Sequence, residues 1–266
     1  MTVLYLALAV MAAMAGVMAV GWLVQRAAKD GGWTDVFWTF GTGAVLAAAA
    51  ITGLGAAPGL AWRRTMVAAM VAVWSLRLGS YIARRVIKGP EDARYAGFRR
   101  DWGARFQTRM IGVMMAQAPA AALLSVSVIL AARDPHPGFR LQDLLGLAVL
   151  AGSVLGESLA DAQMHTFRSN AANKGKVCDS GLWAWSRHPN YFFEAASWIA
   201  YPAIALDFDH PFTLLSLTAP VIMFLTVRFA SGVPPLEEAM LKSRGDAYRA
   251  YQARVSAFIP RPPKSV

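Results

Sequence analysis

Residues 181–202 read G-L-W-A-W-S-R-H-P-N-Y-F-F-E-A-A-S-W-I-A-Y-P, and they decide how the rest of the chain is interpreted. Five polar side chains lie just before an apolar segment: Arg187, His188, Asn190, Tyr191 and Glu194. Pro189 favours the first turn of a helix, where its missing N–H needs no partner. The stretch therefore predicts a helix that begins near Pro189 and whose N-terminus, beside Arg187 and His188, can bind an anion such as a phosphate.

An alternative interpretation of this stretch is an interfacial collar. Arg187 would then reach lipid headgroups, while Tyr191 and Trp198 would belong to an aromatic belt. This alternative explains the arginine and the aromatic residues. It does not explain Asn190 and Glu194, which are four residues apart and share one face of the predicted helix. We therefore expect a polar ligand to bind at this helix.

Composition and long uncharged runs predict an all-α integral membrane protein. The 266 residues are 56% hydrophobic and 16% charged, with a mean hydropathy of +0.39. No charged residue occurs from Val36 to Trp62 or from Met110 to Ala132. Continuous runs of this kind exclude the alternating pattern of a β-barrel. We predict a single domain with seven transmembrane helices at residues 3–24, 35–54, 65–86, 110–131, 142–165, 190–206 and 211–229.

The distribution of positive charge predicts the orientation in the membrane. Most of the 26 Lys and Arg residues fall in the loops after the first, third and fifth predicted spans and in the C-terminal tail. The opposite loops carry only Arg63, Arg64, Arg133 and Arg140. The positive-inside rule then places the N-terminus outside and the C-terminus in the cytoplasm. The same rule explains the net charge of +10, so we expect no nucleic-acid partner.

Two polar segments outside the predicted spans have helical patterns. In the loop after the third span, Phe98, Trp102 and Phe106 recur at helical spacing, which predicts an amphipathic helix along the inner membrane surface. The tail from Pro234 is also predicted to be helical until Gly245 interrupts it. The only cysteine is Cys178 and the four histidines have no zinc-ligand spacing, so we expect neither a disulfide nor a metal site.

Five ionisable residues inside the predicted spans fall in their cytoplasmic halves. They are Asp35, Arg77, Glu157, Asp161 and Glu194. Such residues are costly in a membrane and usually functional, so we predict a polar cavity that opens to the cytoplasm beneath an apolar roof. A soluble ligand would enter from the cytoplasm and an apolar ligand from the bilayer. The alternative is a set of buried ion pairs, for example Arg77 with Asp161, that stabilises helix packing.

Loop residues could hold the phosphates of a dinucleotide, because the chain has no G-x-G-x-x-G and no Walker motif. The candidate phosphate contacts are Arg168, Asn173, Lys176 and Arg187. Further along, Tyr248, Tyr251 and Arg254 could offer an aromatic and cationic surface to an adenine or a phosphate. Taken singly, each cation could instead be an inner-leaflet charge, and the two tyrosines could be membrane contacts.

Several of these motifs resemble one enzyme family. S-R-H-P-N-Y-F-F-E at 186–194 and Y-x-x-Y-x-x-R-x-x-x-F-I-P at 248–260 resemble the C-terminal part of steroid 5α-reductases. W-T-D-V-F-W, R-L-x-x-Y-I-x-R-R and E-D-x-R-Y are similar to bacterial, DUF1295-like members of this 3-oxo-5α-steroid 4-dehydrogenase family. The resemblance covers about residues 33–262. It implies a seven-span enzyme of the bacterial inner membrane that reduces the Δ4 double bond of 3-oxo-steroids with NADPH.

The resemblance also implies roles for individual residues. Asn190 and Glu194 would contact the nicotinamide end and ribose, and Tyr81, polarised by Asp35, would donate to the substrate carbonyl. Ser80 stands where many relatives have His, and the residues around Asp35 depart from the eukaryotic pattern. The predicted cofactor-binding residues are Asp161, Arg168, Asn173, Lys176, Arg187, His188, Asn190, Tyr191, Glu194, Tyr251 and Arg254. The predicted substrate-binding residues are Trp38 and Trp198.

Under this interpretation, hydride adds to the β-carbon of an enone and negative charge develops on its carbonyl oxygen, which needs a hydrogen-bond donor. The expected partners are a small lipophilic enone that enters from the bilayer and membrane lipid, and the expected state is a monomer. NADPH is favoured over NADH only by the number of cations.

Two other functions use the same motifs. R-H-P-x-Y with E-E-x-x-L also occurs in isoprenylcysteine and phospholipid methyltransferases, where Arg187, His188 and Glu237 or Glu238 would hold S-adenosylmethionine. The seven spans, the Asp35, Tyr81 and Arg94–Tyr95 signatures and the phosphate-suited cations favour the reductase. The third possibility is a scaffold or lipid carrier that binds no cofactor.

Overall fold

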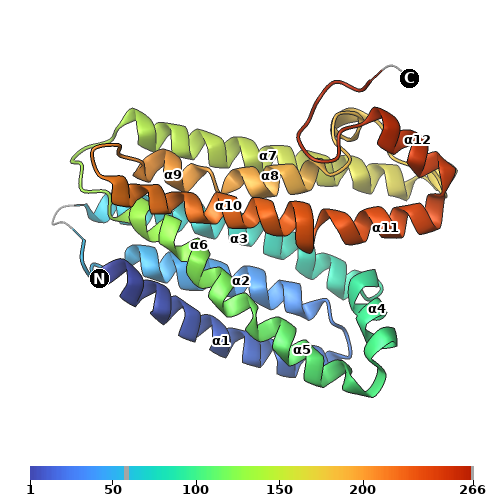
Figure 1. Ribbon diagram of the computed structural model, residues 1–266, viewed down its shortest axis with the longest axis horizontal. Helices are drawn as coiled ribbons and strands as arrows, with labels where there is room; N and C mark the ends of the chain where they lie inside the picture. The colour runs from blue at the N-terminus through green and yellow to red at the C-terminus, as the bar shows by residue number, and fades with distance from the viewer. Residues whose placement is uncertain (57–59, 265–266) are drawn as a thin grey trace. The chain divides into compact units, whose positions relative to one another are not determined.

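The computed structural model describes residues 1–56 and 60–264, and within them the secondary structure is helical with no strand. Six helical stretches of the described chain are long and apolar enough to cross a membrane. Four are single helices: α1 (Thr2–Ala28), α2 (Trp33–Ile51), α3 (Ala61–Lys88) and α7 (Leu141–Ser169). The other two are the stretches Ala93–Ala132 and Pro211–Arg244. These findings confirm the all-α membrane fold (Figure 1).

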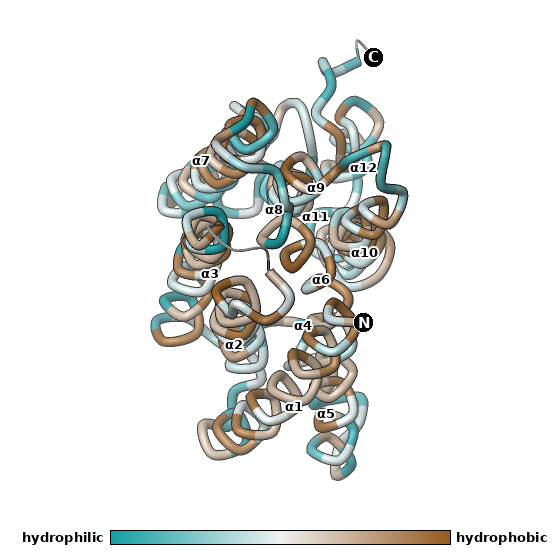
Figure 2. The backbone as a smooth tube through the Cα atoms, turned by 90° about the vertical axis from the view of Figure 1, so that its left-hand side faces the viewer, coloured by the Kyte–Doolittle hydropathy of each residue, from teal (hydrophilic) through white to brown (hydrophobic). Residues whose placement is uncertain are grey.

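The remaining helices are shorter. Ala93–Ala132 contains α4 (Ala93–Trp102), the 3₁₀ turn η1 (Gly103–Arg105), α5 (Phe106–Met115) and α6 (Gln117–Ala132). After α7 come η2 (Ala171–Asn173), η3 (Gly181–Ala184), α8 (Pro189–Ser197) and α9 (Ala200–Ala205). Pro211–Arg244 contains η4 (Pro211–Leu217), α10 (Thr218–Leu225), the π-helical turn η5 (Thr226–Ala230) and α11 (Val233–Arg244). The last helix is α12 (Asp246–Arg254), and the described end of the chain, residues 261–264, is hydrophilic (Figure 2).

The chain divides into two compact units. The first unit comprises Met1–Gly146 and Tyr201–Ala219, and the second comprises Leu147–Ala200 and Pro220–Val266. In the first unit α2 packs against α1, α3 and α6, and α1 also packs against α6. Gly43 of α2 has no Cβ, and a Cβ there would collide with the side chain of Ser75 of α3. The glycine therefore lets these two helices approach closely. The Ser75 hydroxyl uses this proximity to donate to the Thr39 carbonyl at 3.0 Å.

The predicted sixth span, residues 190–206, is interrupted. It forms α8 and α9, which are separated at Trp198–Ile199, and neither is long enough to cross a membrane alone. Pro202 supplies a physical reason, because it lacks the N–H that would bond the carbonyl of Trp198. The predicted fourth span corresponds to α5 and α6 with a joint at Ala116. The count of seven spans therefore stays a prediction.

The two segments outside the predicted spans are helical. Phe98 and Trp102 lie in α4 with their rings stacked 4.5 Å apart, whereas Phe106 is buried at the start of α5, beyond the 3₁₀ turn η1. The position of this segment along the inner membrane surface stays a prediction. Gly245, at a φ of 54°, separates α11 from α12. This left-handed backbone conformation suits glycine because it has no Cβ to clash.

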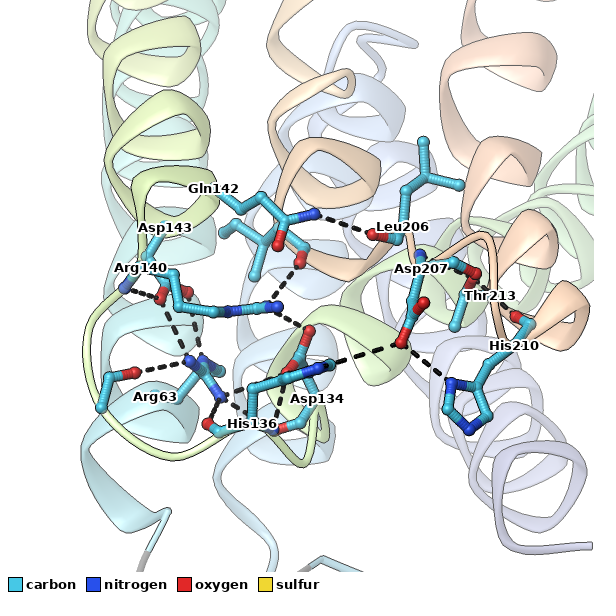
Figure 3. A network of polar contacts seen from close by, with 12 residues as sticks. Arg63, Asp134, His136, Arg140, Gln142, Asp143, Leu206, Asp207, His210 and Thr213 are labelled. Carbon is cyan, nitrogen blue, oxygen red and sulfur yellow. Dashed lines mark hydrogen bonds and ion pairs between the residues drawn. The ribbon is translucent and has the colours of Figure 1, made fainter.

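Arg63 is fully buried in the first turn of α3, which corrects its assignment to a loop (Figure 3). Its guanidinium bonds the Asp143 carboxylate through Nε at 3.1 Å and Nη2 at 3.0 Å. Nη1 donates to the backbone carbonyls of Asp134 and His136 at 2.9 and 2.6 Å, and Nη2 to that of Gly138 at 2.9 Å. Arg63 thus fixes the segment between α6 and α7 to the start of α3.

A second set of bonds joins that segment to the one after α9 within the first unit (Figure 3). The Gln142 side chain donates to the Leu206 carbonyl at 2.8 Å, and His136 Nε2 lies 3.9 Å from the Asp207 carboxylate. Arg140 pairs with Asp134 within the segment between α6 and α7. Asp207 accepts from His210 Nδ1 at 2.9 Å, and this bond lowers the pKa of the Asp207 carboxyl. The Arg63 bonds and these contacts form one polar network at this end of the first unit.

Arg63→Met should destabilise the protein strongly. The substitution leaves Asp143 buried without its guanidinium partner, a loss of about 3–5 kcal/mol for a buried ion pair. The measurement is the thermal unfolding midpoint of the purified protein in detergent. Arg100→Met is the control, because Arg100 pairs with Asp101 at the surface, where such pairs contribute about 0–1 kcal/mol. Equal midpoints for the two variants would contradict the structural role of Arg63.

Candidate functional site

The polar loop before α8 has the helix start that the sequence predicts. His188 is the N-cap residue and Pro189 occupies the first position of α8. The His188 backbone N–H bonds the Ser186 hydroxyl at 3.1 Å, and its ring stacks on that of Tyr191 with centroids 5.9 Å apart. The loop and the helix start are therefore held in one conformation by local contacts.

The carboxylate of Glu237 in α11 accepts hydrogen bonds from the polar side chains around this loop. Its Oε1 accepts from Arg187 Nε at 2.7 Å and from the Tyr248 hydroxyl at 3.0 Å, and it lies 2.9 Å from His188 Nε2. Its Oε2 accepts from Arg187 Nη2 at 3.0 Å and from the Gln252 amide at 2.5 Å. We call these five residues the Glu237 cluster. The pKa of Tyr248 is raised, first by burial and then by the Glu237 charge, so its hydroxyl stays protonated as a donor.

Backbone bonds join the loop to the segment after α12. The Arg187 N–H donates to the Ser256 carbonyl at 2.8 Å, and the Ser186 hydroxyl donates to the Phe258 carbonyl at 2.7 Å. Arg187 Nη1 reaches the Val255 carbonyl at 2.6 Å. The S-R-H-P and F-I-P motifs, about 70 residues apart in sequence, thus lie against each other as a short parallel bridge.

Arg187 and Tyr251 use their polar groups mainly in hydrogen bonds within the protein that hold the loop before α8. Four of the five N–H donors of Arg187 have protein acceptors, so its guanidinium is mainly committed to holding the loop. Tyr251 is 3% exposed, and its hydroxyl donates to the Trp183 carbonyl at 2.5 Å. Their direct contacts with phosphate and adenine remain predictions. Sequence reasoning treated Glu237 and Glu238 as equivalent, but Glu238 is exposed and pairs with Lys242.

The predicted residues of α7 and α8 meet in the second unit. The Asn190 side chain donates to the Asp161 carboxylate at 3.3 Å, and Glu194 accepts from the Trp198 indole N–H at 3.4 Å. Asp161, Glu194 and the neighbouring Glu157 of α7 are all buried. The indole of Trp183 donates to the Ala160 carbonyl at 3.0 Å and fixes the preceding turn to α7. A buried carboxylate of α7 therefore meets a half-buried amide of α8, and each helix buries one further carboxylate.

The predicted phosphate contacts lie around the end of α7. Arg168 and Lys176 are exposed, so their charges can reach an anion. The Asn173 side chain donates to the Phe167 carbonyl at 3.0 Å. Arg254 pairs with Asp179 at 3.3 Å, with both side chains largely exposed. The exposed cations and the buried Asp161–Asn190 pair thus lie on connected segments of one unit.

In the first unit, Asp35 bonds residues of the E-D-x-R-Y motif. Its Oδ1 accepts from the Tyr95 hydroxyl at 2.7 Å, and its Oδ2 pairs with Arg94 Nη2 at 2.6 Å. Tyr81 lies in α3 with the guanidinium of Arg77 over its ring, 5.7 Å from the centroid. The predicted pairing of Asp35 with Tyr81 therefore has a competitor in Tyr95, which sequence reasoning used only as a family signature.

The E-D-x-R-Y motif is anchored on the turn between α1 and α2. Glu91 accepts from the Gly31 N–H at 2.8 Å and from Arg99 at 2.7 Å. Burial raises the pKa of the Glu91 carboxyl, but these hydrogen bonds outweigh burial and leave it below its usual value. A Cβ on Gly31 would lie 2.5 Å from the Tyr95 side chain, so this turn packs closely on the ring. Trp38, the other predicted substrate contact, packs edge-to-face on Trp74 at 6.1 Å.

Several helices are long and apolar enough to cross a membrane, and the helical units also bury carboxylates and amides. The protein is therefore a multi-pass membrane protein with polar sites inside its helical units. The chain belongs to the family described as "Protein of unknown function (DUF1295)", whose profile matches residues 21–255 and so includes every predicted site residue. This family is related to steroid 5α-reductases and to membrane methyltransferase-like proteins. Neither the curated proteins nor the solved structures contain a match to the chain.

Glu237→Gln should loosen the loop before α8. The amide keeps the shape of the side chain but loses the charge that Arg187 and His188 bond, and hydrogen bonds to charged groups contribute about 1.5–3 kcal/mol. The expected result is a lower thermal unfolding midpoint and faster proteolytic cleavage after Arg187. Glu238→Gln is a matched control, because it changes the adjacent exposed carboxylate. Identical cleavage rates for the two variants would show that the Glu237 cluster does not hold the loop.

Proposed function

We propose that the protein reduces the Δ4 C=C bond of 3-oxo-steroids, or of similar lipophilic enones, with NADPH. The proposal includes a single seven-span domain in a bacterial inner membrane, with the N-terminus outside and the C-terminus in the cytoplasm, acting as a monomer on substrate from the bilayer. The observation that carries it is the Asp161–Asn190 contact, in which the Asp161 carboxylate is buried and the Asn190 amide is half-buried, with Glu157 and Glu194 also buried.

Burial of these groups has a physical cost that favours a binding role. Ionised carboxylates inside a membrane protein lose hydration and are retained mainly where they bind a ligand, an ion or a proton. Asn190 and Glu194 share a face of α8, and Asp161 bonds that face from α7. An amide and carboxylates at this spacing match the groups that recognise a carboxamide and ribose hydroxyls.

The donor set fits NADPH, which when bound would supply the hydride for the β-carbon of the enone while a proton completes the saturated ketone. Asn190 and Glu194 would orient the nicotinamide and ribose. Arg168 is exposed and would hold the phosphates. Arg187 would act indirectly, because Glu237 already binds most of its guanidinium.

The substrate carbonyl requires a donor as negative charge develops on its oxygen. Tyr81 would supply this donor as an O–H group. Asp35 already accepts from Tyr95 and Arg94, so polarising Tyr81 would require Asp35 to share its oxygens among three donors. A carboxylate has about four lone-pair sites and can do so.

A methyltransferase is the alternative, and one observation favours it. Glu237 gathers Arg187 and His188, the residues that the methyltransferase pattern assigns to S-adenosylmethionine. In the present arrangement the three side chains bond one another, so a ligand there would have to replace those bonds. We therefore rank this function second.

The cofactor that the protein binds distinguishes the reductase from the methyltransferase. We expect NADPH to raise the thermal unfolding midpoint of the purified protein and to be oxidised when a Δ4-3-oxo-steroid is added. S-adenosylmethionine should do neither, because it has no phosphates for Arg168. Protection by S-adenosylmethionine without protection by NADPH would overturn the reductase proposal in favour of the methyltransferase.

Asp161→Ala and Asn190→Ala should each weaken NADPH binding about tenfold, as expected for losing a hydrogen bond of about 1.5 kcal/mol. The measurement is a fluorescence titration with NADPH. Asp246→Ala serves as the control, since Asp246 is an exposed aspartate of the same unit. Unchanged affinity in both site variants would indicate that the buried pair only supports helix packing.

Tyr81→Phe should lower enone turnover about 10²–10³-fold, the effect of removing one donor to a developing oxyanion, while NADPH affinity is unchanged. Tyr95→Phe tests the competing hydroxyl and Tyr5→Phe, at an exposed position of α1, is the control. Loss in Tyr95→Phe with normal turnover in Tyr81→Phe would transfer the donor role to Tyr95.

A further inference from the structure

The second unit carries a groove on the face of α7 opposite the candidate site. One wall is the α7 segment from Leu159 to Phe167, and the other is formed by Asn173, Ser180 and Gly181, around a volume of about 530 Å³. At 100° per residue, Glu157, Asp161 and Arg168 fall within about 40° of one another on α7. Leu159, Gln163 and Thr166 lie on the opposite side of the helix, so the groove is separate from the Asp161–Asn190 contact.

Both walls of the groove are fixed by hydrogen bonds. The Gln163 side chain accepts from the Leu182 N–H at 2.9 Å, and Asn173 donates to the Phe167 carbonyl at 3.0 Å. Gly181, at a φ of 59°, lets the loop lie directly on the Gln163 amide, where a Cβ would be 2.5 Å away. The groove is therefore preformed, as small-ligand sites usually are.

The lining changes from apolar to polar along α7. Leu159 and Ala162 line one end, while Asn170, Asn173 and Ser180 line the other. From Leu159 to Ser169, where α7 ends, the helix rises about 15 Å, at 1.5 Å per residue. Beyond the apolar end, Leu155 is 70% exposed and extends the apolar track toward the centre of the helix. A ligand matching this groove has a polar head and a hydrocarbon chain.

The polar end is also basic. Lys174 follows Asn173 and is exposed, and the Lys176 N–H bonds the Asn173 carbonyl at 3.0 Å. Arg244 joins this loop by donating to the Lys176 carbonyl at 3.3 Å. The groove lining contains no acidic residue. Three cations beside an uncharged hydrogen-bonding surface complement an anionic headgroup.

We propose that this groove binds an anionic phospholipid. The phosphate lies near Lys174 and Lys176, Asn170 and Ser180 bond the headgroup, and the upper acyl chain follows Leu159 and Leu155. This site does not depend on the reductase function. It gives Lys176 and Asn173 a lipid contact in place of the predicted cofactor contact, and it leaves Arg168, on the other face of α7, for the nucleotide.

Native mass spectrometry of the full chain tests the site, with phosphatidylglycerol and phosphatidylcholine as probes added to delipidated protein. We expect one retained phosphatidylglycerol and little phosphatidylcholine. The double variant Lys174→Gln/Lys176→Gln should bind phosphatidylglycerol about 25-fold more weakly, since each cation near a headgroup contributes about 1 kcal/mol. Thr166→Trp should block retention by filling the groove. Leu144→Trp, at an exposed position near the other end of α7, should retain lipid normally.

Other results would overturn the proposal. Equal retention of both lipids, or unchanged retention in Thr166→Trp, would show that no anionic headgroup binds here. Displacement of phosphatidylglycerol by NADPH would assign the loop cations to the cofactor. A dimer that dissociates in Thr166→Trp would make the groove an interface between two copies of the chain. Because lipid retention is read by mass, these outcomes are distinct from any failure of enone reduction.

Discussion

The second unit depends on one partly buried charge interaction, that between Glu237 and Arg187. A carboxylate with two oxygens accepts from several donors only if those donors converge on it. Here the carboxylate belongs to α11, and the donors come from the loop before α8 and from α12. Without the carboxylate, Arg187 would be a partly buried cation with no counter-charge. The interaction therefore holds the loop that precedes α8, and α8 in turn presents Asn190 to Asp161 of α7.

The first unit is organised by a comparable arrangement at Arg63. Its guanidinium is satisfied by two carboxylates and three carbonyls, which matches the planar fork of arginine donors better than lysine could. Asp35, with Tyr95 and Arg94, organises a second polar contact in the same unit. In both units the apolar helices supply most of the packing, while a few ion pairs determine how the connecting segments attach.

Local sequence patterns predicted the elements whose causes are local. Pro189 marks the start of α8, Gly245 separates α11 from α12, and uncharged runs identify the long helices. Contacts between distant segments were not predictable in this way. Arg63 was read as a loop charge because its partners lie 71–80 residues away, and nothing near it in sequence reveals them. The same limit applies to the choice of Glu237 over Glu238, since both fit the motif and only the fold separates them. Asp161 and Asn190 were each singled out from motifs, and the structure brings them together.

The bridge between Ser186 and Ser256 has a consequence for biosynthesis. The residues that complete the loop before α8 leave the ribosome about 70 residues after the loop itself, since Phe258 and Val255 supply acceptors for Ser186 and Arg187. Domains begin to fold during synthesis from the N-terminal side. The polar loop must therefore wait until the segment after α12 has been synthesised. A ribosome that stalls after α10 would leave a chain whose polar loop lacks both these acceptors and the Glu237 carboxylate.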